Sequence, residues 1–361
     1  MATSELLPQV GQARPFLKWA GGKSQLLPAL RARYPAELRD GQIRRYVEPF
    51  LGGGAVFFDV MQGFDVEEAH LFDANEELIL AYAVIQRDPD ALIGELTLLR
   101  AQYLALDETE RAALFYAVRE QYNAARRAMD FDRYAADWIV RAAQMIFLNK
   151  TCFNGLHRVN SAGLFNVPFG ATRNPVIFDE ENLHAVSKVL GRATLHQGPY
   201  IRCAEFTTGA SFVYFDPPYR PLSQTASFTA YSRDKFGDVQ QRELAVLFAS
   251  LARNTDARLM LSNSDPRHAD PNDAFFDDLY AGFTIERVLA SRMINSRGEG
   301  RGKITEIVVT NYEPHAAATP VELASGHPRS ARKLAARIAL QHARPKSAGD
   351  QVISCNRVGP V

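Results

Sequence analysis

The sequence predicts an α/β protein with a doubly wound sheet, and three features carry this prediction. Short apolar segments that suit buried strands, at 45–50, 211–216 and 257–263, are separated by segments with helical spacing of apolar residues. Three glycines at 52–54 directly follow the first strand and open an apolar helical pattern, which indicates a strand, a tight turn and a helix. A long helical stretch separates the early strands from the late ones, so we expect an insertion within the sheet domain.

Length and composition are those of a globular protein. The chain has 361 residues, enough for one large α/β domain with an insertion or for two domains with separate cores. Hydrophobic residues make up 47% and charged residues 23%, as in ordinary soluble proteins. No apolar run approaches the roughly 20 residues that span a bilayer, and the N-terminus lacks the pattern of a secretory signal. We therefore expect a cytoplasmic protein.

Cysteine spacing argues against two kinds of site. Cys152, Cys203 and Cys355 are far apart in the chain, so they form neither a disulfide framework nor a metal cluster by spacing. None of the eight histidines falls in a recognisable ligand spacing either. We therefore predict that the thiols are buried or incidental. We also predict that the chemistry of this protein requires no metal.

Charge is balanced over the whole chain but unevenly distributed along it. Lys plus Arg and Asp plus Glu number 41 each, so net charge gives no reason to expect a nucleic-acid partner. Residues 138–178, however, contain no acid, although they include Arg141, Lys150, Arg158 and Arg173. A second basic cluster consists of Arg287, Arg292, Arg297, Arg301 and Lys303. Clusters of this size also occur on solvated surfaces, so they need support from other features.

The first part of the predicted sheet carries the features of a cofactor site. "RYVEPF" runs into "LGGGAVFFDVM", and "AHLFDANEELILAY" supplies a second strand that ends in Asp73, followed by a helix that Asp73 or Asn75 could cap. In doubly wound sheets, glycines after the first strand permit close approach to an adenosine cofactor, and a carboxylate about 20 residues later accepts from ribose hydroxyls. The glycines here lack the full dinucleotide fingerprint.

The rest of the chain divides into an insertion, a second half of the sheet and a tail. Residues 89–144 have helical spacing, whereas "NKTCFNGLHRVNSAGLFNVPFG" at 149–170 suits hairpins and exposed loops. Strand patterns return at "SFVYFD", "ARLMLSN" and "TEIVVTNY". We therefore predict a discontinuous sheet domain at 12–84 and 186–312 and an insertion at 85–185. Residues 313–361 are predicted to be a basic, flexible or partly helical tail.

One short motif imitates a phosphate-binding loop. Gly22, Lys23 and Ser24 reproduce the end of a Walker A sequence, but that pattern requires a glycine at the position of Leu17. An ATPase is therefore the least favoured function. Lys23, with Trp19 nearby, is better interpreted as a cation beside another ligand.

The segment "FVYFDPPYR" is the strongest chemical motif. Asp216 follows a strongly apolar strand, so it lies where doubly wound folds place their reacting groups. The two prolines hold the next residues extended and leave carbonyl oxygens as acceptors. The Asp216 carboxylate and a proline carbonyl can accept both hydrogens of an exocyclic amino group while Tyr219 stacks on the attached base. The same four residues could also simply end a strand.

These motifs resemble those of the Dam-type (D12 class) N6-adenine-specific DNA methyltransferases, especially members that recognise GATC. The resemblance extends over nearly all of residues 14–312 and includes "FLKWAGGK", "EPFLGGGAVF", "FNGLHRVNSAGLFNVPFG", "DPPYRPLSQTASFTAY", "LSNSD" and "RMINSRGEGRGKITEIVVTNY", in that family's order. It implies a Rossmann-like S-adenosylmethionine-dependent methyltransferase fold with an inserted, mostly helical DNA-recognition domain. S-adenosylmethionine would be the methyl donor and the N6 amino group of adenine the acceptor.

The resemblance also implies roles for individual residues. The catalytic site would comprise Asp216, Pro217, Pro218 and Tyr219. The cofactor-contacting residues would be Trp19, Lys23, Glu48, Pro49, Phe50, Gly52, Gly54, Asp73 and Asp216. The candidates for DNA contacts are Lys18, Lys150, Asn154, Arg158, Asn160 and Asn166. Arginine suits a guanine edge and asparagine an adenine edge, although each asparagine here could equally serve a turn.

The expected partner is double-stranded DNA, bound by a monomer in the nucleoid. An adenine inside a duplex must be flipped out before its amino group can reach a buried methyl donor, which costs a few kcal/mol. Methyl transfer is then a direct in-line displacement that requires orientation and hydrogen-bond acceptors but no metal. The acid-free stretch 138–178 fits a surface that faces phosphates.

One departure from the family pattern keeps a second function open. The family often has an acidic residue that helps to hold the flipped adenine where this chain has Pro199, so Glu205 or a backbone group would have to replace it. A catalytically weakened DNA-binding regulator is therefore an alternative. A methyltransferase for RNA or protein glutamine is another, although those commonly carry N-P-P-Y and would not need a large DNA-reading insertion.

Overall fold

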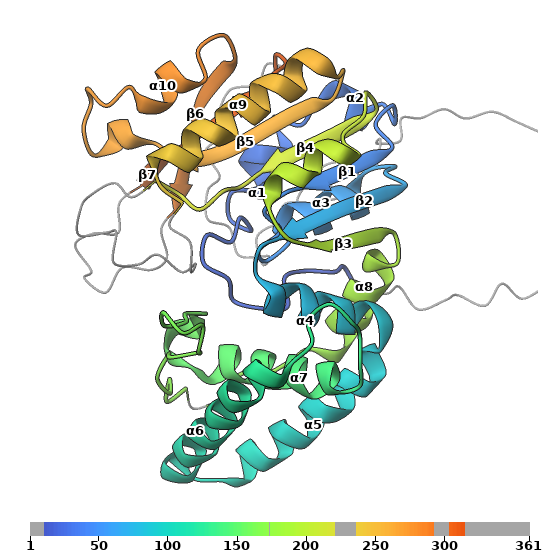
Figure 1. Ribbon diagram of the computed structural model, residues 1–361, viewed down its shortest axis with the longest axis vertical. Helices are drawn as coiled ribbons and strands as arrows, with labels where there is room; N and C mark the ends of the chain where they lie inside the picture. The colour runs from blue at the N-terminus through green and yellow to red at the C-terminus, as the bar shows by residue number, and fades with distance from the viewer. Residues whose placement is uncertain (1–10, 173, 221–235, 292–302, 315–361) are drawn as a thin grey trace, which may run out of the picture. The chain divides into compact units, whose positions relative to one another are not determined.

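The computed structural model describes residues 11–172, 174–220, 236–291 and 303–314 (Figure 1). These residues all belong to one compact unit, Met1–His315. The second unit, Ala316–Val361, lies outside the described residues, as do most of the predicted tail, Cys355, Arg173 and the three arginines at 292, 297 and 301.

A seven-stranded sheet in the order β3-β2-β1-β4-β5-β7-β6 confirms the predicted α/β fold. Neighbours among the first five strands are parallel, whereas β7 is antiparallel to both β5 and β6. The strands are β1 (Arg45–Glu48), β2 (Glu68–Asp73), β3 (Ala193–Gln197), β4 (Ser211–Phe215), β5 (Arg258–Ser264), β6 (Thr284–Ser291) and β7 (Lys303–Thr310). The early strands β1 and β2 precede the long helical stretch and β4, β5 and β7 follow it, as the sequence predicts.

Two hydrophobic clusters cover the opposite faces of this sheet. Along β1, Tyr46 belongs to one cluster and Val47 to the other, and along β4 the same holds for Tyr214 and Phe215. Every residue of β4 is buried. A strand that is covered on both faces needs apolar side chains at successive positions, which explains the unbroken apolar run before Asp216.

Several helices begin at recognisable capping residues. The ten α-helices of the described residues are α1 (Leu27–Arg31), α2 (Ala36–Arg39), α3 (Ala55–Gly63), α4 (Glu76–Arg87), α5 (Pro89–Ala105), α6 (Glu108–Ala125), α7 (Asp137–Thr151), α8 (Glu180–Leu190), α9 (Asp238–Asn254) and α10 (Phe275–Leu279). Asn75 caps α4 by accepting from the amides of Glu77 and Leu78, so of the two predicted caps the structure uses Asn75. Asp107 and Glu110 form a capping box at the start of α6.

Helices α4 to α8 lie between β2 and β3 in the chain. Figure 1 shows α5, α6 and α7 side by side, and buried side chains such as Leu92, Phe115 and Phe147 join them to the cluster that covers one face of the sheet. The segment that follows α7 contains the 3-10 helix η2 (Phe153–Gly155) and two isolated antiparallel bridges, Cys152 with Phe169 and Val159 with Phe165. The helical stretch and the loop-rich segment after it are thus both as predicted.

Strand β6 was not expected from the sequence. It pairs with β7 alone and forms one end of the sheet, so it needs no continuous apolar run. Its sequence "TIERVLAS" places Glu286 and Arg287 in the middle of the strand, and Leu289 is largely exposed. These features are typical of an edge strand. Because β6 has no continuous apolar run, its sequence does not show the pattern of a buried strand.

Candidate active site

The predicted catalytic and cofactor residues come together at one edge of the sheet. Strands β1, β2 and β4 run parallel, and they end at Glu48, Asp73 and Phe215. Because parallel strands bring their carboxyl ends to the same edge, Glu48, Asp73 and Asp216 all lie there. In open α/β sheets this is the edge at which ligands bind.

The glycine turn after β1 is tied to the end of β2. Asp73 accepts the amide of Gly52 through Oδ2 at 3.0 Å and the amide of Asn75 through Oδ1 at 2.8 Å. Burial raises the pKa of Asp73, and these two backbone hydrogen bonds oppose that rise. Asp73 therefore holds the turn in place, a role that the sequence did not show.

The turn is closely packed and excludes larger residues. Gly54 has a φ of 70°, and a Cβ atom there would lie 2.7 Å from the hydroxyl oxygen of Tyr82. Trp19 lies against the same turn, because a Cβ atom at Gly52 would be 3.1 Å from its Cδ1 atom. The predicted cofactor residues Trp19, Gly52 and Gly54 are thus neighbours.

Lys23 joins the loop that carries Trp19 to the catalytic motif. Its Nζ atom is 2.8 Å from Oδ1 of Asp216, donates to the carbonyl of Gly21 at 2.6 Å and lies 4.5 Å from the ring centre of Tyr219. The Lys23 side chain is only 6% exposed. The cation is therefore buried between a carboxylate and an aromatic ring, an arrangement unlike a phosphate-binding loop.

Asp216 has an unusually high proton affinity. Burial raises the pKa of Asp216 to about 6, against the opposing effect of Lys23, and the negative charge of Glu306 raises it further. Ser262 also donates to Oδ1 of Asp216, at 3.3 Å, and shares a hydrogen bond of 2.7 Å with the hydroxyl of Tyr214. Both donors thus reach Oδ1 of the carboxylate.

The end of β1 and the two residues after it supply a buried acid, a buried proline and an aromatic ring. Tyr46 donates to Oε2 of Glu48 at 2.8 Å, and burial raises the pKa of Glu48 well above its ordinary value. Pro49 is buried, and Phe50 stacks on Tyr200 with ring centres 5.1 Å apart. Glu48, Pro49 and Phe50 therefore lie at the predicted edge, with Glu48 close enough to Asp216 and Lys23 to interact electrostatically.

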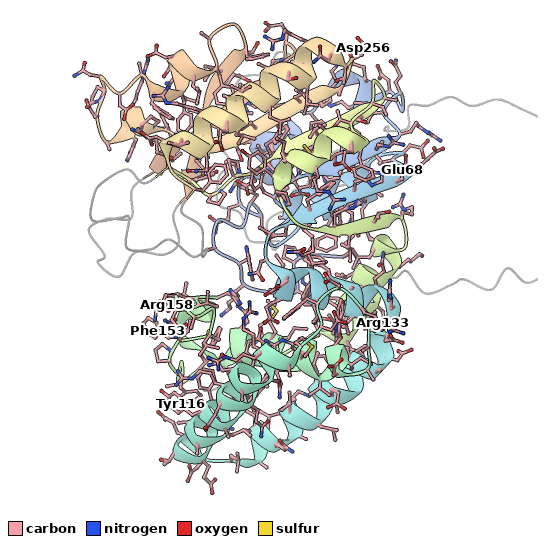
Figure 2. The ribbon with its side chains drawn as sticks, viewed as in Figure 1. Glu68, Tyr116, Arg133, Phe153, Arg158 and Asp256 are labelled. Atoms are coloured by element: carbon pink, nitrogen blue, oxygen red, sulfur yellow. The ribbon has the colours of Figure 1, made fainter. Side chains whose placement is uncertain are left out.

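In the loop-rich segment 152–170, some of the predicted DNA-contacting side chains are exposed and others form hydrogen bonds within the segment. Arg158 and Asn154 are exposed, and Figure 2 labels Arg158 near the exposed Phe153. Arg158 donates through Nε to Oδ1 of Asn166 at 2.8 Å. Asn160 accepts through Oδ1 from the amides of Ala162 and Leu164, each at 3.0 Å, so its side chain supports a turn.

The two predicted lysines are near each other at the base of this segment. Asn149 bonds to both the amide and the carbonyl of Lys18, each at 2.9 Å, and to the carbonyl of Gly155 at 3.0 Å. Burial, together with the charges of Lys18 and Arg14, lowers the pKa of Lys150 to about 8. Lys18 and Lys150 therefore share one positively charged area.

Comparison with known proteins decides the family. The family model of the D12 class N6 adenine-specific DNA methyltransferases matches residues 19–294, which is more than half of the chain. The chain belongs to this family. The match contains the strand-end site, and the chain is an adenine-specific DNA methyltransferase.

The chain is similar to curated relatives over at least 95% of their length. The type II methyltransferase M.MjaIII of Methanocaldococcus jannaschii is 45% identical over 302 residues, covering 83% of this chain and 100% of that protein. The type II methyltransferase M1.LlaDCHI of Lactococcus lactis is 35% identical over 83% of this chain and 95% of its own. The DNA adenine methylase of Vibrio cholerae is 33% identical over 84% of this chain and 97% of its own.

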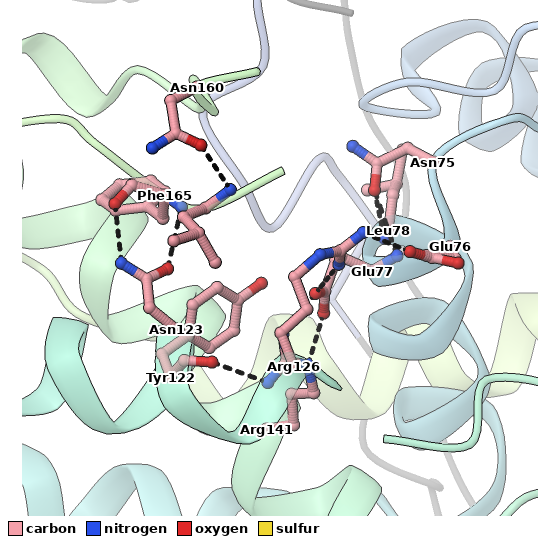
Figure 3. Close-up of polar contacts among 11 residues, drawn as sticks. Asn75, Glu76, Glu77, Leu78, Tyr122, Asn123, Arg126, Arg141, Asn160 and Phe165 are labelled. Carbon is pink, nitrogen blue, oxygen red and sulfur yellow. Dashed lines mark hydrogen bonds and ion pairs between the residues drawn. The ribbon is translucent and has the colours of Figure 1, made fainter. Parts of the chain in front are cut away.

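A buried charge network links the methyltransferase sheet to the loop-rich segment (Figure 3). Glu77, in the first turn of α4, binds Arg141 of α7 and Arg126, and the carbonyl of Tyr122 accepts from Arg141 at 2.9 Å. The next residue of α6, Asn123, pairs with both backbone groups of Phe165, at 2.8 and 3.0 Å. Arg141 is 1% exposed, which corrects its assignment to a surface that faces phosphates.

Arg287, from the second basic cluster, forms ion pairs with Asp265 and Asp277. Cys152 and Cys203 are buried free thiols, as expected. No group of three or more His, Cys, Asp or Glu side chains in the described part of the chain is placed to hold a metal, and none of its helices is long and apolar enough to cross a membrane.

Pro199 lies directly beside the strand-end site. It precedes the 3-10 helix η3 (Tyr200–Phe206), and the preceding Gly198 donates its amide to the carbonyl of Asp73 at 3.1 Å. Glu205 has a largely exposed side chain whose carboxylate lies 3.8 Å from Nε of Arg202. The turn at Pro199 therefore brings a backbone segment and Tyr200 to the site, whereas the carboxylate of Glu205 interacts with Arg202.

Sequence reasoning missed three side chains of this site: Tyr214, Ser262 and Glu306. The hydroxyl of Tyr219 donates to Oε2 of Glu306 at 2.5 Å. Ser262 directly follows the apolar run "LML" of "RLMLSNS", and Glu306 directly precedes the apolar run "IVV" of "KITEIVVT". Because a polar residue in a covered strand needs a partner, a polar residue that borders such a run was the available signal.

Proposed function

We propose that this adenine-specific DNA methyltransferase transfers a methyl group from S-adenosylmethionine to the N6 amino group of an adenine flipped out of duplex DNA, within the sequence GATC. The observation that carries this proposal is the buried contact of Lys23, Asp216 and Tyr219 at the carboxyl end of β4. It combines an acceptor for an amino group, a cation that holds that acceptor and a ring on which a base can stack.

The residues around the glycine turn fit an adenosine-containing cofactor. The left-handed backbone of Gly52 and Gly54 and the nearby Trp19 ring leave no room for a side chain at the turn, which is the property that close approach of a cofactor requires. We assign Asp73 to contacts with the ribose hydroxyls. We assign Trp19 and residues 48–50 to contacts with the rest of the cofactor. When bound, the cofactor supplies a methyl group on a cationic sulfonium.

The chain's own residues then orient the amino group. Lys23 and Ser262 occupy Oδ1 of Asp216, so we assign Oδ2 to one hydrogen of the amino group and the carbonyl of Pro217 to the other. The carbonyl of Pro218 is already held by Gln241 of α9, which donates to it at 3.0 Å. These acceptors direct the nitrogen lone pair toward the methyl group and act mainly by orientation and electrostatics.

Tyr219 recovers part of the cost of base flipping. Removing an adenine from the stack costs a few kcal/mol, and stacking on an aromatic ring recovers about 1–3 kcal/mol. The Nζ atom of Lys23 lies over one face of the Tyr219 ring. We assign the opposite face of this ring to the flipped adenine.

We further propose that the segment 85–185 recognises DNA and that the sheet domain consists of 12–84 and 186–312, acting as a monomer. Arg158 is the exposed side chain best suited to a guanine edge, and Lys18 and Lys150 supply positive charge beside it for phosphates. Asn154 remains a candidate for base contacts, whereas Asn160 and Asn166 support the turn and Arg158. The GATC assignment rests on the resemblance of this segment to GATC-recognising members.

A methylation assay on matched duplexes tests this function. The purified enzyme is incubated with labelled S-adenosylmethionine and with three duplexes: one containing GATC, one in which the same bases are scrambled, and one in which both GATC adenines already carry an N6-methyl group. We expect labelling of the first duplex alone. Equal labelling of the first two would refute GATC specificity, and labelling of the premethylated duplex would refute the N6 acceptor.

A further inference from the structure

Strand β7 brings a carboxylate to the catalytic edge of the sheet because it runs against the other strands. Glu306 is opposite Ser264 of β5 in the antiparallel register. The parallel strands end at this edge, so an antiparallel strand has its beginning there. Glu306, which pairs with the last residue of β5, is thereby placed next to the residues that follow β4.

The Tyr219 side chain is held at two points, one face of its ring and its hydroxyl group. Lys23 lies over one face at 4.5 Å, and Glu306 accepts the hydroxyl hydrogen at 2.5 Å. Burial raises the pKa of Tyr219 well above its ordinary value, so the hydroxyl keeps the proton that it donates. Stacking alone requires only the ring, so the hydroxyl and its carboxylate partner need a separate explanation.

We infer that Glu306 is a positioning residue for methyl transfer, because its carboxylate holds the Tyr219 hydroxyl and so keeps the ring in the orientation that receives the target adenine. This inference rests on the proposed function. Glu306 does not touch the adenine or the methyl donor and acts through Tyr219. A hydrogen bond to a charged acceptor is strong enough to fix the rotation of a ring that is also held by a cation.

The charge of Glu306 has a second effect on the same site. Its carboxylate raises the pKa of Asp216, whereas Lys23 lowers it, and Glu48, Tyr214 and Tyr219 are the other titratable groups that interact with these residues. Removing the charge while keeping an acceptor should therefore lower the pKa of Asp216. A purely structural role for Glu306 would leave the pH dependence of the enzyme unchanged.

A double-mutant cycle of Glu306→Ala and Tyr219→Phe tests the inference. Each single variant should lower kcat by about tenfold, with little change in affinity for GATC duplexes, because the hydrogen bond orients the Tyr219 ring and is not itself a contact with DNA. The double variant should be no slower than either single variant, since both remove the same interaction. Thr305→Val is the matched control, because it removes another side-chain hydrogen bond from β7, that to Asp265, without touching Tyr219.

Two further readouts separate positioning from folding. Glu306→Gln should restore most of kcat at alkaline pH and move the acid limb of the pH profile to lower pH. With 2-aminopurine in place of the target adenine and S-adenosylhomocysteine bound, Glu306→Ala should give a brighter complex than the wild type, because a base that stacks poorly on Tyr219 is quenched less.

Three results would overturn the inference: a wild-type kcat in Glu306→Ala, multiplicative effects in the double variant, or an acid limb that Glu306→Gln leaves in place. Failure of the proposed function gives a different result, because the wild-type enzyme would then not methylate the GATC duplex at all.

Discussion

The strand-end site and the loop-rich segment 152–170 differ in how their polar side chains are arranged. At the strand ends, Lys23, Asp216 and Tyr219 are paired with one another or with Glu306, and Lys23 is almost fully buried. In the loop-rich segment, the side chains of Asn154 and Arg158 are exposed. The segment is attached to the helices by other residues, through the hydrogen bonds between Asn123 and Phe165. Chemistry requires groups that are fixed before the substrate arrives, whereas recognition of a groove requires groups that project from their support.

The two regions also depend on different kinds of support. Asp216 is supported from neighbouring strands through Ser262, and Tyr219 through Glu306. The loop-rich segment is supported by helices, through Asn123 of α6 and the network of Glu77 with Arg126 and Arg141 (Figure 3). Since α4 begins just after Asp73, one helix connects the carboxyl end of β2 to the network that supports the loop-rich segment.

The largest effect is expected at the centre of the strand-end site. Asp216→Ala should lower kcat by about a thousandfold, because it removes the acceptor that is held in place for the amino group. Circular dichroism and DNA binding should remain as in the wild type. The measurement is single-turnover methylation of a GATC duplex. A variant that is well folded and binds DNA but methylates at the wild-type rate would show that Asp216 is not the acceptor.

The next largest effect is expected for the charge network that supports the loop-rich segment. Glu77→Ala leaves the buried guanidinium of Arg141 without its carboxylate, which should lower the free energy of unfolding by about 3–5 kcal/mol. Glu77 is 5% exposed and also binds Arg126, whereas the adjacent Glu76 binds Arg126 alone from a more exposed position. Urea unfolding of Glu76→Ala is the matched control and should show a clearly smaller loss. Equal losses in the two variants would contradict the role assigned to Arg141.

Much of this comparison was predictable from the sequence because the strand ends carry local motifs. The glycine turn, Asp73 and the D-P-P-Y sequence each follow an apolar strand, so their common edge follows from the parallel arrangement. Glu306 was not predictable in this way, since its place depends on the antiparallel direction of β7, which no local pattern shows. Arg141 was misassigned because its partner Glu77 is 64 positions away in the chain.

A smaller effect, on discrimination between DNA sequences, should distinguish Arg158 from Asn166 in the loop-rich segment. Arg158→Ala should cost about 1–3 kcal/mol of discrimination between GATC and a site with a changed guanine, with little loss of folding stability. Asn166→Ala should weaken discrimination less, because it releases the Arg158 side chain without removing it. Competition binding with single-substitution duplexes measures both. If Asn166→Ala loses more discrimination than Arg158→Ala, the asparagine contacts the base directly.

The smallest change concerns how the two charges around Asp216 set its pH range. Since burial raises the pKa of Asp216 to about 6, kcat/KM should fall below that pH, by about tenfold for each further pH unit, as the acceptor becomes protonated. Lys23→Ala removes a charge that lowers the pKa of Asp216, so the acid limb should move to higher pH.

The Lys23→Ala variant should also weaken S-adenosylmethionine binding, which calorimetry measures, and the enzyme should release no phosphate from ATP. Because burial raises the pKa of Asp216, ionisation of this carboxyl lowers the free energy of unfolding as pH rises through about 6, and the charge of Lys23 reduces that loss. Lys23→Met keeps a side chain of similar length without the charge, so it separates charge from packing. An acid limb that stays in place in both variants would mean that Lys23 serves only to fill space beside Tyr219.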